Sequence, residues 1–314
     1  MKSVSKYFWP AVGLITITLS AWLLYNELRG LSLDELADSL KAIPARNWVL
    51  CGLSTIVAYG ALAGYDRIAL RHLGKHINWF FITVCSFTTY ALSHNVGASV
   101  FSGAVVRYRA YTSKGLTPTE VGILVTFCSF TFLLGTILLG GLILVLRPDI
   151  AERFVDILPS GISTSLGFLF LAFVGLYIVG SLFGFRPLKI GYIEVPYPKP
   201  SIVARQLTIG PLELIGAAAI IYFALPEAGN PGFIVILGIF LVSFSAALIS
   251  HAPGGLGVLE LVFLTGLPDM DPADVLAALL VFRLFYLLIP FFIALFVIFV
   301  FERSQWRNKN QDAD

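Results

Sequence analysis

Long apolar stretches separated by short polar segments run through most of the chain. They fall at about residues 7–25, 48–70, 79–94, 119–146, 162–183, 207–225, 233–250 and 273–301. Several reach the roughly 20 residues that a helix needs to cross a bilayer. Because the stretches are continuous rather than alternating, they favour helices and exclude a transmembrane barrel. The pattern predicts an all-α polytopic membrane protein with about eight full transmembrane helices in a single domain over residues 1–301. A polar, frayed tail is expected over residues 302–314.

The first apolar stretch is predicted to be a retained membrane span. It is too long for a signal peptide, and no small-x-small cleavage site follows it. The next segment carries the capping-box residues Ser32 and Glu35 and places the apolar residues of 33–40 on one helical face. This arrangement predicts a short helix at the membrane surface.

Two of the apolar stretches end in the same way, which indicates an internal repeat. Each ends in Ser-His, continues into a short segment with glycines, and restarts with a helix cap, a proline and an acid. The copies read Ser93-His94, segment 97–112 and Thr117-Pro118-Thr119-Glu120, then Ser250-His251, segment 252–267 and Asp271-Pro272-Ala273-Asp274. The predicted repeat halves are about 78–146 and 233–301.

Glycine and proline are expected to break the helix in each half. The residues concerned are Gly97, Gly103, Pro253, Gly254, Gly255 and Gly257. Broken backbone at membrane depth is tolerated only where it lines a cavity or is buried in protein. A pair of interrupted helices at corresponding positions is also the best sequence indication of a transporter's binding site.

Composition agrees with a membrane location. The chain is 57% hydrophobic and only 13% charged, whereas a soluble domain carries roughly 25% charged residues. Cys51, Cys85 and Cys128 lie in apolar stretches without metal-ligand spacing, so we expect small buried residues. His72 and His76 lack a nearby acid or thiol, and we predict no metal and no cofactor. The sequence has no Ser-His-Asp set, phosphate loop or basic-aromatic surface, which disfavours an enzyme and a nucleic-acid partner.

The positions of lysine and arginine predict the orientation in the membrane, because short cytoplasmic loops are enriched in them. If each broken segment carries the chain back across the membrane, every basic cluster lies on one side, and the acidic loop 269–274 lies on the other. If neither segment crosses, the basic loop 184–205 and the cluster 107–114 lie outside. We therefore favour crossing, with an inverted repeat and both termini in the cytoplasm. Re-entry of the two segments is the alternative.

Charged residues inside the apolar stretches are candidates for function. A charge at membrane depth costs at least a few kcal/mol and usually faces a cavity or a partner. The candidates are Asp66, Arg107, Arg109, Glu213, Glu260 and Arg283. We expect Arg107 and Arg109 to bind lipid phosphate, with Glu260 balancing them. A structural ion pair, or arginines anchored at the headgroups, is the alternative. Arg283 is expected at the same site, or as the partner of Glu260 or Glu213.

His94 and His251 follow the same serine in the two repeat halves. They are candidates for hydrogen bonds to unwound backbone, or for proton relay near neutral pH. A simple helix–helix hydrogen bond is the alternative.

Three motifs resemble a known family. They read SGAVVRYRAY at 102–111, followed by Gly115-Leu116, then HAPGGLGVLE at 251–260, and AALLVFR at 277–283. The first two resemble the membrane region of the bifunctional lysyl-phosphatidylglycerol synthase/flippase proteins. In length and in the third motif the chain resembles the YbhN-like inner-membrane proteins. The resemblance implies a domain of the bacterial inner membrane that moves phospholipids, or other polar lipids, between leaflets.

The chain departs from the bifunctional proteins in one respect. Those proteins carry a soluble aminoacyl-transfer domain after their spans, whereas this chain ends shortly after residue 301. Lipid aminoacylation is therefore not expected, and a lysyl lipid is not implied as the substrate.

Together these observations predict flippase-like translocation of a phospholipid through a polar groove at the repeat interface. The expected partners are membrane lipids with an anionic or zwitterionic headgroup. Assembly of the chain into a homo-oligomer is a further alternative. One alternative is a membrane-embedded enzyme acting on a lipid or lipid-linked substrate. The other is a non-transporting scaffold for lipid enzymes, in which the intramembrane charges pair completely with one another.

Overall fold

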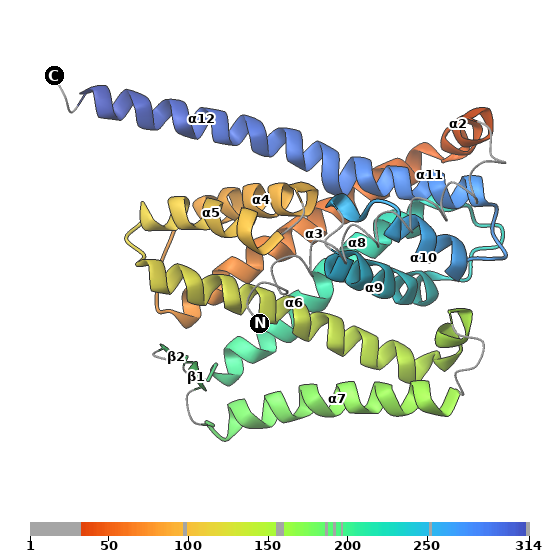
Figure 1. Ribbon diagram of the computed structural model, residues 1–314, viewed down its shortest axis with the longest axis horizontal. Coiled ribbons are helices and arrows are strands. Elements are labelled where there is room, and N and C mark those ends of the chain that lie inside the picture. The colour runs from red at the N-terminus through yellow and green to blue at the C-terminus, as the bar shows by residue number, and fades with distance from the viewer. Residues whose placement is uncertain are drawn as a thin grey trace, which may run out of the picture.

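The computed structural model describes residues 33–96, 99–154, 160–185, 188–190, 193–195, 197–250 and 253–311. The predicted first span at 7–25 and Ser32 of the predicted capping box lie outside these residues. The described chain is predominantly helical, as predicted, and its long helices form one elongated bundle (Figure 1).

The helices follow the predicted apolar stretches. They are α2 (Leu33–Ala42), α3 (Ala45–His72), α4 (Trp79–Val96), α5 (Ser99–Thr112), α6 (Pro118–Leu146), the 3-10 helix η1 (Pro148–Arg153), α7 (Ser160–Leu182), α8 (Pro200–Ala224), α9 (Phe233–Ser250), the 3-10 turn η2 (Pro253–Gly255), α10 (Val258–Gly266), α11 (Pro272–Phe282), the π-helical turn η3 (Arg283–Leu288) and α12 (Ile289–Gln311). Strands β1 (Leu188–Ile190) and β2 (Ile193–Val195) pair antiparallel between α7 and α8.

Six segments of the described chain are long and apolar enough to cross a membrane. They are 45–72, 118–146, 161–182, 200–224, 233–250 and 272–300. The predicted count of about eight full spans is not confirmed.

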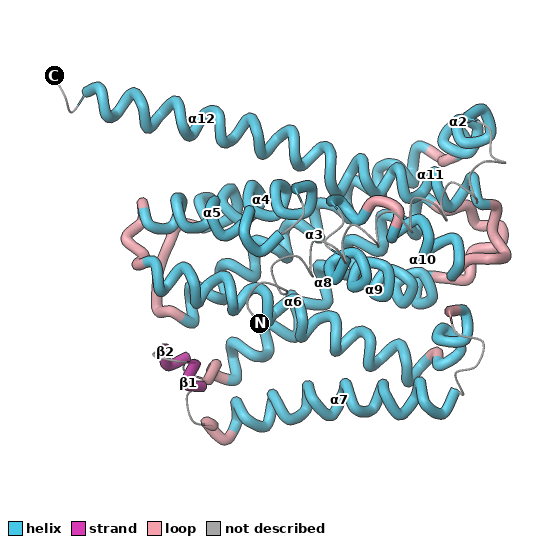
Figure 2. The backbone as a smooth tube through the Cα atoms, viewed as in Figure 1, coloured by secondary structure: helices cyan, strands magenta, loops and turns pink. Residues whose placement is uncertain are grey.

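The connections between helices gather at the two ends of the bundle (Figure 1 and Figure 2). One end holds the basic α3–α4 and α5–α6 connections and the β1–β2 hairpin; Lys75 Nζ there lies 2.8 Å from Glu120 Oε1. The opposite end holds the α8–α9 connection and the acidic α10–α11 connection, and Arg153 there donates to the Gly266 carbonyl at 3.0 Å. Basic and acidic connections therefore lie at different ends.

Helices α4 and α5 fold back on each other as an antiparallel pair, the first hairpin. Near its open end, the ring centroids of Phe81 in α4 and Tyr111 in α5 lie 6.0 Å apart. Near its tip, a Cβ on Gly103 would lie 2.5 Å from Ser93 Oγ. Helix α5 thus returns to the end of the bundle at which α4 begins (Figure 1).

Helices α9 and α10 form the second hairpin, which begins at the opposite end of the bundle (Figure 1). Near its open end, a Cβ on Gly266 would lie 3.0 Å from Ile239 Cδ1, and near its tip one on Gly255 would lie 3.1 Å from Ala247 Cβ. The elements α4–α5–α6 and α9–α10–α11 therefore form an inverted repeat.

The tip of the first hairpin, at Asn95, and the tip of the second, at Gly254, meet near the middle of the last membrane-spanning segment, 272–300. Asn95 Nδ2 of the first tip donates to the Leu287 carbonyl at 3.1 Å. Arg283 Nη1 donates to the Gly254 carbonyl of the second tip at 2.8 Å. Both tips therefore lie beside the middle of this last segment.

Helices α5 and α10 return to the ends of the bundle at which α4 and α9 begin, which is the sidedness that crossing by each broken segment predicts (Figure 1). Whether the two segments span the whole hydrocarbon core or re-enter stays a prediction. At 1.5 Å per residue, the 14 residues of α5 extend only roughly 21 Å, less than the ~30 Å hydrocarbon core. The nine residues of α10 extend even less. Because a hairpin leaves on the side that it enters, the basic connections still lie together.

The centre of the bundle is the crossing of α3 and α8, which approach through small residues. A Cβ on Gly216 would lie 2.9 Å from the Ala58 backbone nitrogen. Gly135 of α6 approaches α8 in the same way, since its Cβ would lie 2.6 Å from the Gly210 carbonyl carbon. Small residues allow such close packing of the backbones. In lipid, where no hydrophobic effect drives helices together, this packing stabilises their association. The crossing places Glu213 of α8 in the interior.

Helix starts follow the local sequence signals. Thr117 Oγ1 accepts from Glu120 N at 3.2 Å, and Glu120 Oε2 accepts from Thr117 N at 2.8 Å, a complete capping box. Asp271 Oδ1 accepts from Ala273 N at 2.8 Å at the start of α11. The tail predicted as frayed from Glu302 is instead helical, because α12 continues to Gln311 through a stretch without glycine or proline.

Candidate functional site

The first charged cluster ties the first hairpin to α3. Asp66 accepts from Arg107 Nη2 at 2.7 Å, from Arg107 Nε at 3.3 Å and from the Tyr111 hydroxyl at 2.8 Å. The Arg107 guanidinium lies 4.7 Å from the ring centre of Tyr90, and Cys128 Sγ contacts the same carboxylate at 3.4 Å. Removing one member of such a buried pair leaves the other charge uncompensated, so the cluster fixes α5 against α3.

The second charged cluster closes the second hairpin. Glu260 accepts from the Gly257 N–H at 2.8 Å and from Arg283 Nε at 3.0 Å, and Arg283 Nη2 donates to the same carboxylate. The turn that this cluster encloses has positive φ at Gly254, Gly255 and Gly257, a conformation that glycine adopts without strain. Pro253 begins this turn, η2, which separates α9 from α10. The cluster therefore holds unwound backbone against the last span.

A third buried carboxyl belongs to Glu213 in α8, which is 1% exposed. The Tyr286 hydroxyl donates to its Oε1. The Tyr65 hydroxyl faces the same carboxyl while donating to the Gly210 carbonyl at 3.1 Å. Among the described residues Glu213 forms no ion pair. The complete pairing of intramembrane charges that a scaffold predicts is therefore not found at Glu213 in the described chain.

The π-helical turn η3 (Arg283–Leu288) is where these elements converge. Single π turns inside α-helices frequently mark functional sites. The Tyr286 carbonyl accepts from the Tyr59 hydroxyl at 2.9 Å, and the Leu287 carbonyl accepts from Asn95. The His94 ring stacks on the Tyr286 ring with centroids 5.1 Å apart. One turn of helix thus contacts both hairpin tips as well as α3 and α8.

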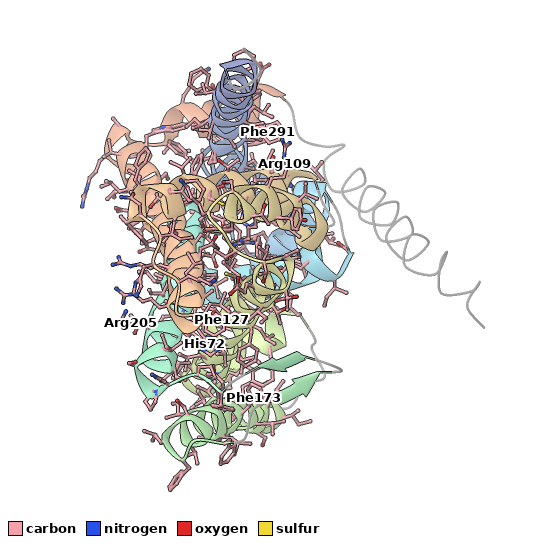
Figure 3. The ribbon with its side chains drawn as sticks, turned by 90° about the vertical axis from the view of Figure 1, so that its left-hand side faces the viewer. His72, Arg109, Phe127, Phe173, Arg205 and Phe291 are labelled. Atoms are coloured by element: carbon pink, nitrogen blue, oxygen red, sulfur yellow. The ribbon has the colours of Figure 1, made fainter. Side chains whose placement is uncertain are left out.

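The structure separates residues that the sequence analysis grouped. Arg107 is paired with Asp66 instead of being balanced by Glu260. Glu260 is paired with Arg283, which is one of its expected alternatives. Arg109 lies two positions after Arg107, on another face of α5, and its side chain is exposed (Figure 3). The expected group of Arg107, Arg109 and Glu260 does not form, because Asp66 neutralises Arg107 inside the bundle.

The remaining predicted residues have different positions. His94 lies in the first tip, and its Nδ1 is buried without a hydrogen-bond partner among the described residues. His251 and Gly97 lie outside the described residues. Gly103 lies inside α5 and does not break a helix; close packing against Ser93 accounts for its small size. The His72 ring stacks on the Phe127 ring with centroids 4.9 Å apart (Figure 3).

Three partners are absent from the sequence-based prediction. They are Asp66 as the partner of Arg107, Tyr286 as the donor to Glu213, and Asn95 as the donor to the last span. Tyr286 follows Arg283 by three positions, and this spacing places both on one helix face, which is a usable signal. No local pattern indicates the Asp66–Arg107 pair, whose members lie 41 positions apart.

The two ion pairs differ in accessibility, which separates their roles. Both side chains of the Glu260–Arg283 pair are 11% exposed, whereas Arg107 and Asp66 are 6% and 0% exposed. A guanidinium binds carboxylate and phosphate with the same forked geometry. Arg283 is therefore the better placed of the two arginines to exchange its carboxylate for an anionic group.

Comparison with known proteins identifies relatives along the whole bundle. The family described as Lysylphosphatidylglycerol synthase TM region matches residues 11–294. An uncharacterized protein of Synechocystis is 30% identical over 313 residues, which are 99% of this chain and 96% of that protein. The inner membrane protein YbhN of Escherichia coli is 30% identical over 268 residues, 82% of this chain and 81% of that protein. A phosphatidylglycerol lysyltransferase of Staphylococcus haemolyticus is 26% identical over 308 residues, 94% of this chain but 34% of that protein.

Proposed function

Because the chain belongs to the family of lysylphosphatidylglycerol synthase transmembrane regions, we propose that it moves a phospholipid between the leaflets of a bacterial inner membrane. The observation that carries the proposal is the meeting of two polar hairpin tips half-way along a membrane-spanning segment. Hydrocarbon strongly disfavours a polar headgroup at this depth. The tips supply charged and hydrogen-bonding groups at that depth, while the acyl chains stay in the surrounding bilayer.

The headgroup phosphate is proposed to bind at Arg283. In the described conformation Glu260 occupies this guanidinium and also closes the first turn of α10 through the Gly257 N–H. When the phosphate displaces Glu260, it gains the guanidinium fork and the free N–H groups at the helix start, both of which favour an anion. Return of Glu260 releases the headgroup. Arg107, held by Asp66, keeps the first hairpin in place during this exchange.

The basic end of the bundle is proposed to face the cytoplasm, with both termini on that side. Lysine and arginine gather at the α3–α4 and α5–α6 connections and around the start of α8, where Arg205 is exposed (Figure 3). Cytoplasmic loops carry this excess. The acids Asp269 and Asp271 lie at the opposite end, on the start of the last span.

The proposed activity leaves the lipid chemically unchanged. The test uses proteoliposomes with headgroup-labelled phospholipids, dithionite quenching of the accessible leaflet, and mass spectrometry of the recovered lipid. Wild-type protein is expected to expose inner-leaflet label faster than empty vesicles, at constant lipid mass. A changed lipid mass would favour the membrane-embedded enzyme.

Glu260→Gln tests the site, because glutamine keeps the size of the side chain and its bond to Gly257 while removing the charge. Charge-assisted hydrogen bonds contribute roughly 1.5–3 kcal/mol, so the variant is expected to translocate lipid at least about tenfold more slowly. Glu227→Gln, the same change on an exposed residue of the α8–α9 connection, is the matched control. A wild-type rate in Glu260→Gln would refute the site, and no lipid movement by folded wild-type protein would refute the function.

A further inference from the structure

Glu213 differs from the other buried carboxyl groups of the described chain. Asp66 and Glu260 each face an arginine. Glu213 is more deeply buried than Glu260 and nearly as deeply as Asp66. Yet among the described residues it accepts a hydrogen bond only from the Tyr286 hydroxyl, and its Oε2 has no hydrogen-bond partner. A carboxylate in this position would be a nearly isolated charge at membrane depth.

The elements packed against Glu213 offer it phenols rather than cations. Helix α3 contributes Tyr59 and Tyr65, and η3 contributes Tyr286, on which His94 of α4 stacks. Helix α9 carries no ionisable residue, and α11 carries only Asp274, in its first turn. Helix α6 meets α8 through Gly135 and through Thr131, which accepts from Gln206; α7 contributes Tyr177 to the same glutamine.

These surroundings fit a protonated carboxyl group. An isolated ionised carboxylate in low dielectric is so unfavourable that the group takes up a proton instead. The proton also supplies the donor that the site lacks. The Tyr65 hydroxyl donates to the Gly210 carbonyl and faces the carboxyl, so its oxygen is available to accept from Glu213 Oε2–H. A protonated Glu213 would thus extend a hydrogen-bonded chain through Tyr65 to Gly210.

The position of this group gives its protonation a consequence. Its partner Tyr286 lies in η3, which also holds both hairpin tips through Asn95 and Arg283. When the Oε2–H bond breaks, its electron pair stays on the carboxylate and the proton passes to water. The Tyr65 hydroxyl then turns from Gly210 to donate to the carboxylate, and a full negative charge appears beside the meeting point of the tips.

Resting on the proposed function, we propose that Glu213 is a proton-binding site that couples lipid movement to a proton gradient. Protonated Glu213 stabilises the described conformation, in which both tips are docked on η3. Loss of the proton favours release of the tips and exchange of the headgroup. Proton uptake from one side of the membrane and release to the other then gives lipid movement a direction.

The first test detects the proton directly and needs no transport. Infrared spectra of the purified protein in lipid are compared for wild type, Glu213→Gln and Glu227→Gln at neutral pH. We expect a C=O stretching band of a protonated carboxyl that is lost in Glu213→Gln and retained in Glu227→Gln. Tyr65→Phe should move this band to higher frequency, because the carboxyl O–H loses its acceptor. A spectrum without a band that depends on Glu213 would overturn the proposal.

The second test measures lipid translocation in proteoliposomes with and without an imposed pH difference. Wild type and Glu227→Gln should translocate label faster with the gradient. Glu213→Gln, which is permanently neutral, should show equal rates with and without it. Equal rates in wild type would overturn the coupling while leaving the proposed function intact. Absence of any lipid movement in wild type would overturn the proposed function and the coupling together, while the infrared band independently decides whether Glu213 holds a proton.

Discussion

Replacement of Asp66 by asparagine tests how the first hairpin is held. The change keeps the shape of the side chain but leaves the Arg107 guanidinium buried without its counter-ion, and it weakens the bond from Tyr111. Arg107 is 6% exposed, so water cannot take over the role of the carboxylate. Breaking a buried pair in this way costs roughly 3–5 kcal/mol. Since whole domains are stable by roughly 5–15 kcal/mol, the variant should lose a large share of its stability.

A double-mutant cycle separates the pair from its surroundings. Asp66→Asn, Arg107→Met and the double variant are unfolded with SDS in mixed micelles and followed by circular dichroism. Because the double variant contains neither buried charge, it should be more stable than the sum of the single effects predicts, by about 1–3 kcal/mol. Asp38→Asn, whose partner Lys41 is 76% exposed, is the control for the same substitution at the surface. Additive effects, or an Asp66→Asn variant as stable as the control, would show that the pair does not anchor α5.

Two further predictions concern packing and helix capping. Gly135→Ala should destabilise the α6–α8 contact by about 1–3 kcal/mol, since its Cβ would meet backbone atoms of Gly210. Gly122→Ala in the same helix is the control, because a Cβ there would meet nothing within 4 Å, and it should stabilise the protein by up to about 1 kcal/mol. Equal effects of the two substitutions in thermal unfolding would contradict the packing argument. Asp271→Ala should cost about 1 kcal/mol through loss of the cap on Ala273 N. Asp271→Asn should retain most of that stability, because asparagine also caps a helix. If Asp271→Asn loses as much stability as Asp271→Ala, the charge of Asp271 and not its cap hydrogen bond stabilises the helix.

Local sequence signals predicted the starts of helices well. Thr117, Pro118 and Glu120 place the beginning of α6 because capping is settled by neighbouring residues. The break around Gly254 was also readable, since consecutive glycines and a proline rarely continue an apolar helix. The same reasoning failed at Gly103, where the small residue serves a contact between two helices, which no single segment reveals.

Partners of intramembrane charges were less predictable than the charges themselves. The cost of a buried charge identifies Arg107, Glu213, Glu260 and Arg283 as candidates, but it does not say which residues meet. The docking of the two tips was unpredictable for a related reason. Hydropathy measures how apolar α4 and α9 are, whereas their depth depends on the tip-to-tip contact through η3, which forms only when the whole bundle is assembled.

The distance along the chain between the two tips has a consequence for biogenesis. Asn95 finds its acceptor at Leu287, 192 positions later. At roughly 5–20 residues per second, the ribosome needs about 10 to 40 seconds to make that interval. Throughout this time the first hairpin has a polar tip in the membrane and no docking surface for it. An emerging chain of this kind needs an insertase or lipid headgroups to shield the tip, and truncation before Leu287 should leave the first hairpin open to quality-control proteolysis.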